Sequence, residues 1–275
     1  MKFADLHLHT IFSDGTYTPV ELIRQSKKKG LSVIAIVDHD TVSGIEPAIE
    51  SAKKEGIEII PGIELSADFD GLEIHILGYF IDYKNILFKN KLKDLSAVRT
   101  ERIYKILDKL NGLGIKLDPK AVFNLAKDGT VGRLHIARAL VNEGLVPSAQ
   151  EVFKKYIGDN CPAYVCGFRF SPQEAIKFIK DFGGIPVLAH PYVLNRDDLI
   201  PQFVDYGLMG IEVYYPEHTQ SMINFYLNMA KKYNLLVTGG SDCHGKAKPE
   251  VKIGMIKLPY ELVEKLIEAQ NLNRS

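Results

Sequence analysis

The stretch Val33-Ile34-Ala35-Ile36-Val37-Asp38-His39-Asp40 decides the fold, because five consecutive apolar residues end abruptly in three polar ones. Parallel strands that are buried on both faces have unbroken apolar runs of this kind. Helical patterns lie on either side, over Pro19–Lys29 and over Ile45–Glu55, and a glycine follows the last lysines of each. This repeated strand–helix unit predicts an α/β barrel or an open parallel sheet.

The same alternation opens and closes the chain but is interrupted in between. Residues 85 to about 157 show only helical patterns, with an apolar stripe at three-to-four spacing. We therefore predict an α/β barrel made of residues 1–83 and 168–275, with a helical insertion over residues 84–167. The other predicted strands are Phe3–Leu8, Ile57–Ile63, Leu72–Phe80, Ile185–Ala189, Gly210–Tyr215 and Leu235–Gly240.

Composition limits the class of protein. The chain has 275 residues, 46% of them hydrophobic, and a formal net charge of zero. It can form a sizeable core, and its charge does not indicate a nucleic-acid coat or a membrane-surface protein. No apolar run is long enough to cross a bilayer, and the first residues show no signal-peptide pattern. Three unevenly spaced cysteines favour a reducing compartment. We expect a cytoplasmic protein without membrane contact or an obligate protein partner.

Histidines and carboxylates gather where the apolar runs end. His7 and His9 are two residues apart, so both point to the same side of a strand and can share one ion. Asp14 follows in a turn that can fold back over the same rim. In a closed barrel these strand ends face one mouth, so residues distant in sequence meet there. The other candidates are His39, Glu64, His75, His190, Asp242 and His244.

This set is too large for one tetrahedral zinc site. Six imidazoles and three carboxylates can hold two or three divalent ions, with a carboxylate such as Glu64 bridging. Carboxylates beside imidazoles suit Mn²⁺, Fe²⁺ or Zn²⁺. A single buried histidine is usually just hydrogen-bonded, and His75, inside its apolar run, is open to that interpretation. The shared placement of the whole set favours a metal centre.

Five motifs resemble those of the PHP (polymerase and histidinol phosphatase) family. They are Asp5-Leu6-His7-Leu8-His9-Thr10 with Phe12-Ser13-Asp14-Gly15, Asp38-His39-Asp40, Pro61-Gly62-Ile63-Glu64, Ala189-His190-Pro191, and Ser241-Asp242-Cys243-His244-Gly245. The resemblance spans the chain and implies a distorted (β/α)7 barrel that binds two or three divalent metal ions and hydrolyses phosphoesters. The metal ligands it implies are His7, His9, Asp14, His39, Glu64, His75, His190, Asp242 and His244.

Within that family the chain is most similar to the stand-alone nucleotide phosphoesterases. The stretches Gly15–Pro19, Asp40–Gly44 and Gly132–Ala137 carry this resemblance. It implies removal of the 3′-phosphate from nucleoside 3′,5′-bisphosphates, or 5′-3′ degradation of short 5′-phosphorylated RNA. The nucleophile would be a hydroxide that bridges the metal ions. A nucleotide or a short oligonucleotide is accordingly the expected partner.

Four further residues are candidates for direct roles. Arg133 and His135 stand at the start of a predicted helix in the insertion, where arginine and a helix N-terminus both favour phosphate. We predict that the insertion forms a lid and that these two residues bind a second substrate phosphate. Asp40 and His218 are candidates for the group that protonates the leaving oxygen.

Three alternatives stay open. The closest is a histidinol-phosphate phosphatase, which would use the same metal centre. A hydrolase of C–N bonds is a second, because metal-containing barrels of related geometry carry out that chemistry. The third is a metal-binding module without catalysis, although a purely structural site would be smaller and closed.

Overall fold

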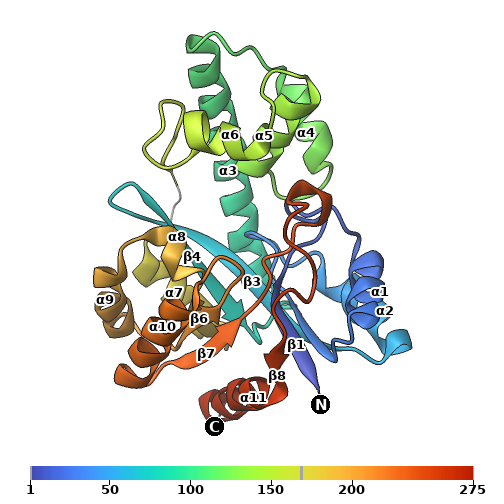
Figure 1. Ribbon diagram of the computed structural model, residues 1–275, viewed down its shortest axis with the longest axis vertical. Helices are drawn as coiled ribbons and strands as arrows, with labels where there is room; N and C mark the ends of the chain where they lie inside the picture. The colour runs from blue at the N-terminus through green and yellow to red at the C-terminus, as the bar shows by residue number, and fades with distance from the viewer. Residues whose placement is uncertain (1, 168–169, 275) are drawn as a thin grey trace.

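A computed structural model describes residues 2–167 and 170–274. Eight strands lie within them: β1 (Phe3–Leu8), β2 (Val33–Ile36), β3 (Glu58–Phe69), β4 (Leu72–Tyr79), β5 (Ile185–Leu188), β6 (Gly210–Tyr214), β7 (Leu236–Gly239) and β8 (Leu258–Pro259). They form one sheet in the order β7-β6-β5-β4-β3-β2-β1-β8. The segment after β7 returns to β1, where His9 N donates to Cys243 O at 3.2 Å and Asp242 N donates to His7 O at 2.9 Å. These bonds nearly close the sheet (Figure 1), so the predicted distorted α/β barrel is confirmed.

The β3–β4 pair departs from the predicted strands. β3 continues past Ile63, the end that its apolar run predicts, and only the turn Asp70-Gly71 separates it from β4. A connection this short cannot cross over to a parallel strand, so the two strands form an antiparallel hairpin. Both turn residues have positive φ, 52° and 84°. As a result Glu64 and His75 lie inside strands, although a bridge to His39 keeps Glu64 level with the end of β2.

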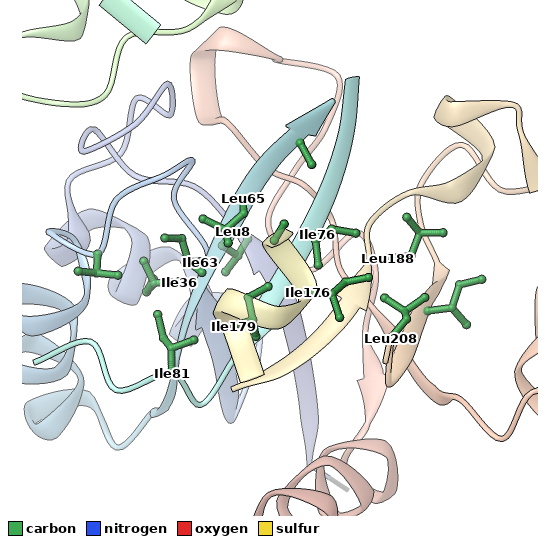
Figure 2. Close-up of a cluster of buried hydrophobic side chains, with 14 of the residues drawn as sticks. Leu8, Ile36, Ile63, Leu65, Ile76, Ile81, Ile176, Ile179, Leu188 and Leu208 are labelled. Atoms are coloured by element: carbon green, nitrogen blue, oxygen red, sulfur yellow. The ribbon is translucent and has the colours of Figure 1, made fainter. Parts of the chain in front are cut away.

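Two hydrophobic clusters account for the unbroken apolar run of β2. Val33 and Ala35 belong to the cluster inside the barrel, whereas Ile34 and Ile36 belong to the cluster between the sheet and the outer helices. Figure 2 shows part of the outer cluster, in which Ile179 from a covering helix packs beside the sheet. Each isoleucine buried in this way contributes about 1.5–3 kcal/mol to stability. Both faces of the strand therefore select apolar residues.

Helices cover the outside of the barrel and one of its ends. α11 lies across the bottom of the barrel in Figure 1, and its Val263 and Leu266 join the inner cluster. The sequence prediction missed both α11 and β8, which pairs antiparallel with β1. The helical elements around the barrel are α1 (Pro19–Lys28), α2 (Ile45–Glu55), α7 (Pro172–Asp181), α8 (Pro191–Leu194), η2 (Asp197–Leu199), α9 (Ile200–Asp205), α10 (Gln220–Lys232), η3 (Gly245–Ala247) and α11 (Tyr260–Arg274).

A second set of helical elements lies between β4 and α7. The elements are α3 (Ile86–Gly112), α4 (Pro119–Ala126), α5 (Arg133–Asn142), α6 (Ala149–Val152) and the π-helical turn η1 (Phe153–Ile157). They enclose a third hydrophobic cluster and stand above the barrel in Figure 1. The predicted boundary at residue 168 lies outside the described residues, so the division into barrel and insertion stays a prediction. None of the described helices has the length and apolarity to span a membrane.

Candidate metal centre

Asp38 fixes the loop that follows β1. Its carboxylate accepts hydrogen bonds from Thr10 N at 2.7 Å, from Thr10 Oγ1 at 2.6 Å and from Ser13 Oγ at 2.6 Å. All three residues are buried. The loop is thereby folded back over the end of β2, and Asp14 is carried to the mouth of the barrel, as the turn in the sequence suggested.

Asp5 does the same for the loop after β7. Its carboxylate accepts hydrogen bonds from Ser241 N at 2.8 Å, from Ser241 Oγ at 2.7 Å and from Gly254 N at 2.9 Å. Burial raises the pKa of Asp5 to about 6, while these hydrogen bonds oppose the shift. The contact joins two strands that lie far apart in sequence, and it places Asp242 and His244 beside β1.

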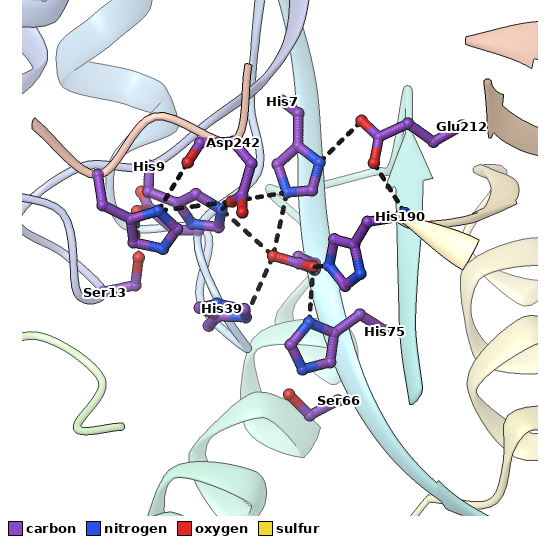
Figure 3. A network of polar contacts seen from close by, with 12 residues as sticks. His7, His9, Ser13, His39, Ser66, His75, His190, Glu212 and Asp242 are labelled. Carbon is purple, nitrogen blue, oxygen red and sulfur yellow. Dashed lines mark hydrogen bonds and ion pairs between the residues drawn. The ribbon is translucent and has the colours of Figure 1, made fainter. Parts of the chain in front are cut away.

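Four buried side chains form the first group at the mouth. His9 Nε2 lies 3.2 Å from Glu64 Oε2 and 3.1 Å from Asp242 Oδ1. His7 Nε2 lies 3.3 Å and 3.4 Å from the same two oxygens. Figure 3 shows His7 and His9 beside Asp242, with dashed lines that mark contacts between the residues drawn. One ligand atom from each residue lies within 4.8 Å of the others, a spacing that suits a single ion.

The second group shares His9 with the first. Asp14 Oδ1 lies 3.1 Å from His244 Nε2, and Asp14 Oδ2 lies 3.9 Å from His39 Nε2. The rings of His9 and His244 are stacked, with centroids 4.1 Å apart. These four residues also offer ligand atoms within 4.8 Å of one another. Sequence positions from 9 to 244 thus meet in one small volume.

The third group surrounds the other oxygen of Glu64. Its Oε1 lies 2.8 Å from His75 Nδ1 and 3.1 Å from His190 Nε2, while His39 Nδ1 lies 3.3 Å from Oε2. His39, Glu64 and His75 form a metal-sized set. Glu64 belongs to two of the three groups, and its role as a bridging ligand stays a prediction. The structure therefore brings all nine predicted ligands together.

The electrostatics of these groups favour cations. Burial alone would raise the pKa of Glu64, but the imidazoles of His39, His75 and His7 hold it well below its usual range. Burial opposes the charged form of His9, yet Asp242 and Glu64 raise the pKa of His9 to about 9. Buried carboxylates that raise the pKa of neighbouring imidazoles also attract divalent ions. The donor set of imidazole nitrogens and carboxylate oxygens accordingly fits Mn²⁺, Fe²⁺ or Zn²⁺.

Three residues at the mouth have unusual backbone conformations. Asp40, His190 and Asp242 have φ values of 50°, 25° and 53°, a region that non-glycine residues rarely adopt. Such conformations cost of order 1–3 kcal/mol each and persist only where surrounding structure enforces them. Their concentration at this rim supports a functional site there.

Glu212 is a site residue that the sequence prediction missed. Its Oε1 lies 2.9 Å from His7 Nδ1, and its Oε2 accepts a hydrogen bond from His190 N at 2.8 Å. A proton held between Glu212 and His7 Nδ1 leaves His7 Nε2 free to ligate, which is how carboxylates commonly orient metal-binding histidines. A signal was present in the sequence, since Glu212 is the one charge in the run Gly210-Ile211-Glu212-Val213.

Glu73 connects the metal centre to the helices above it. Its Oε1 lies 3.0 Å from His75 Nε2, and its Oε2 lies 2.7 Å from a terminal nitrogen of both Arg102 and Arg133. Arg133 also pairs with Asp159 at 2.8 Å. Two carboxylates thus already hold the guanidinium that was predicted to bind substrate. That role of Arg133 stays a prediction.

Like Glu73, Asp40 pairs with an arginine of the helices above the barrel. Arg99 Nε of α3 donates to its Oδ2 at 2.6 Å, and Ser66 N donates to its Oδ1 at 3.1 Å. Both partners of the ion pair are almost fully buried. These contacts hold α3 on the barrel, and each carboxylate oxygen of Asp40 already accepts a hydrogen bond. A role as general acid stays an untested prediction.

Replacing Asp40 distinguishes the two roles. Asp40→Ala leaves the Arg99 guanidinium without this carboxylate, so the free energy of unfolding should fall by about 3–5 kcal/mol, the usual cost of breaking a buried pair. Chemical denaturation measures the change, with Asp198→Ala as a control because Asp198 is an exposed, ion-paired aspartate. Wild-type stability, together with loss of the alkaline limb of the pH–rate profile, would instead identify Asp40 as the acid.

His218 is separated from the candidate ligand Asp242 by the side chain of Tyr215. Its Nδ1 donates to Val213 O at 2.8 Å, and its buried Nε2 has no hydrogen-bond partner among the described residues. Its ring centroid is 5.4 Å from that of Tyr215, whose hydroxyl donates to Asp242 at 3.1 Å. Burial lowers the pKa of His218, which favours the neutral ring. This geometry fits a hydrogen-bond acceptor better than a proton donor.

Lys248 is another residue that the sequence prediction missed. Its ammonium group lies 3.0 Å from Asp242 Oδ2, the same oxygen that accepts from Tyr215. Burial would lower the pKa of Lys248, but Asp242 raises it. The second oxygen of Asp242 is therefore occupied, which leaves Oδ1 to face His7 and His9. The loop after β7 gave no periodic signal from which this lysine could be placed.

A barrel mouth with several metal-sized groups of imidazoles and carboxylates defines a class, the metal-dependent hydrolases built on β/α barrels. Comparison with known proteins names the family. Residues 5–130 match the PHP domain. A 5′-3′ exoribonuclease of Haemophilus influenzae is 36% identical over 248 residues, which cover 88% of this chain and 90% of that protein. The chain belongs to the PHP family.

Other relatives differ in activity. A phosphoribosyl 1,2-cyclic phosphate 1,2-diphosphodiesterase of Eggerthella lenta is 31% identical, over 88% of this chain and 94% of that protein. A 3′,5′-nucleoside bisphosphate phosphatase of Chromobacterium violaceum is 31% identical, over 92% and 91%. A crystal structure of a proposed metal-dependent phosphoesterase from Bifidobacterium adolescentis has a TM-score of 0.88 at 31% identity, over 96% and 95%. The resemblance seen in the sequence is confirmed.

Proposed function

We propose that this protein is a metal-dependent phosphoesterase that acts on nucleotide phosphates. The observation that carries the proposal is the set of three overlapping groups, which share His9, His39 and Glu64 at the barrel mouth. Full-length similarity to a 5′-3′ exoribonuclease and to a 3′,5′-nucleoside bisphosphate phosphatase supports a nucleotide or short oligonucleotide as the substrate. Histidinol phosphate is the alternative substrate.

Nine residues are proposed to hold two or three divalent ions, with Glu64 shared between them. When bound, these ions supply Lewis acidity for the phosphate oxygens and lower the pKa of a water molecule. The protein fixes the ligand atoms beforehand: Glu212 orients His7, while Glu73 lies against His75. Rigid placement matters because small displacements at a reacting centre cost large factors in rate.

The helical elements α3, α4, α5, α6 and η1 are proposed to act as a lid. Asp40 and Glu73 attach them to the barrel through Arg99, Arg102 and Arg133. A lid anchored by buried ion pairs is held in one position and excludes water from the mouth, which strengthens charge interactions there. We also propose a cytoplasmic location, because the three cysteines are all free.

A metal-coupled substrate screen tests the proposed function. The purified protein is stripped with a chelator and reloaded with Mn²⁺, Fe²⁺ or Zn²⁺. It is then assayed for inorganic phosphate, for nucleoside 5′-monophosphates released from RNA, and for the ring-opened product of the cyclic phosphate. The substrates are a nucleoside 3′,5′-bisphosphate, short 5′-phosphorylated RNA, a ribose cyclic phosphate and histidinol phosphate. We expect metal-dependent hydrolysis, fastest on a nucleotide. Fastest turnover of histidinol phosphate would move the assignment to the alternative. Ammonia release from amides without phosphate release would identify a C–N hydrolase.

A further inference from the structure

The first turn of α5 reaches the metal centre from above. A methyl group added at Gly132, directly before the helix, would lie 3.7 Å from Asp14 Oδ2 and 3.3 Å from a terminal nitrogen of Arg99. The ten-residue helix α5 therefore begins against the group formed by Asp14, His39 and His244. Its N-terminal end favours anions, because the first N–H groups of a helix lack partners within it.

His135, in this first turn, has its tautomer fixed by the backbone. Gly132 N donates to His135 Nδ1 at 3.1 Å, so Nδ1 accepts and the ring proton lies on Nε2. Among residues 2–167 and 170–274 no protein acceptor takes that Nε2 proton. The ring is nearly fully buried, and the charges of Asp14 and His244 act on it. A hydrogen-bond donor thus stands beside the metal centre without a protein partner.

Arg138 lies on the same face of α5, three residues further on. It is partly exposed, and the charge of Asp14 acts on it while burial opposes its own charge. Arg99, Arg102 and Arg133 each pair with a carboxylate. Of the four arginines on α3 and α5, all of them within the described residues, Arg138 is the one without a carboxylate partner. Its guanidinium fork is available for an external anion.

We propose that the His135 Nε2–H group and the Arg138 guanidinium bind the oxygens of the phosphoryl group that is hydrolysed. This inference rests on the proposed function. It adds Arg138 as a substrate residue, and it assigns His135 to the reacting phosphate in place of the second phosphate predicted from the sequence. α5 begins beside Asp14, and Arg138 follows His135 by about one helical turn. An anion held between these two residues and the centre would present its remaining oxygens to the metal ligands. A second phosphate elsewhere on the substrate would lie outside the space between these two side chains and the metal centre.

Two measurements test the proposed phosphate-binding role of Arg138 and His135. Inorganic phosphate binding to the Mn²⁺-loaded protein is measured by calorimetry, and kcat/KM is measured for p-nitrophenyl phosphate and for a nucleoside 3′,5′-bisphosphate. Arg138→Met should weaken phosphate binding and lower kcat/KM on both substrates by about 10- to 100-fold, as expected for loss of a charged hydrogen bond. Arg138→Lys should restore part of the loss. Arg24→Met, which removes an exposed arginine on α1, is the matched control and should change neither.

His135 is tested in the same assays. His135→Gln keeps an N–H donor and should retain more activity than His135→Leu, with metal content and circular dichroism used to confirm that each variant folds. A loss confined to the bisphosphate would overturn the assignment to the reacting phosphoryl group, as would unchanged phosphate binding in every variant. The wild-type protein could also hydrolyse no ester and yet bind phosphate in an Arg138-dependent way. The proposed function would then fail, while the phosphate-binding role of Arg138 would stand.

Discussion

Asp242→Ala is expected to abolish turnover while the protein stays folded. Asp242 Oδ1 lies within 3.1–3.4 Å of nitrogens of His7, His9 and His244, so its loss removes a ligand atom from the first group. Replacing a residue that only supports a metal ligand costs 10–100-fold, and losing the ligand itself should lower kcat/KM by at least about 10³-fold. The apolar core lies below this rim and is untouched, so the variant should still fold, although Lys248 and Tyr215 lose their shared acceptor and thermal stability should fall.

The measurement pairs metal analysis with phosphate release. Asp198→Ala serves as the control, because it also removes one carboxylate, from an exposed pair with Arg196. We expect the Asp242 variant to bind less metal than the control and the control to match the wild-type protein. Full metal content and wild-type rates in the Asp242 variant would remove this residue from the proposed ligand set. The same comparison applies to His9→Ala.

The second large effect is expected from Gly240→Ala, which acts on the closure of the barrel. A Cβ atom at Gly240 would lie 2.8 Å from His7 Cα and still closer to the N and Cβ atoms of that residue. No side-chain rotation can relieve an overlap with backbone, so β1 and the segment after β7 must separate. We expect the free energy of unfolding to fall by about 3 kcal/mol, at the upper end for overpacking.

Gly112→Ala is the matched control for this prediction. Gly112 ends α3, and an added methyl group there meets no atom within 4 Å. Alanine at such a site should be neutral or stabilise the protein by about 0.4–1 kcal/mol. Denaturant unfolding and metal titration of both variants give the comparison. A Gly240 variant as stable as the wild-type protein, with intact metal binding, would mean that β1 and the segment after β7 do not meet as closely as described.

Local patterns predict much of this protein because they reflect local physics. Five consecutive apolar residues before His39 predict a doubly buried strand, and β2 covers four of them, Val33–Ile36. Spacing by two predicts that His7 and His9 point to one side, and their Nε2 atoms do face the same carboxylates. Strand ends in a barrel meet at one mouth, so the candidate ligands could be grouped without knowing any distance.

Other features depend on partners that are distant in sequence. The length of β3 depends on its hairpin partner β4, because a strand that projects beyond the rim is stabilised by pairing and not by its own apolar run. Glu212 was missed because a single glutamate in a strand carries no pattern until His7 is placed beside it. α11 gave no clear periodic signal, and its position is set by the open end of the barrel.

The sequence by itself therefore determined the barrel, the interruption by helices and the candidate metal-binding residues, since periodicity and strand-end placement are properties of neighbouring residues. Only the tertiary structure decided which charged groups are already paired. Arg133 and Arg138 are both arginines on α5, yet Glu73 and Asp159 hold the first, and Arg138 has no carboxylate partner within the described residues. Pairing depends on distances between segments far apart in the chain, and those distances exist only after folding.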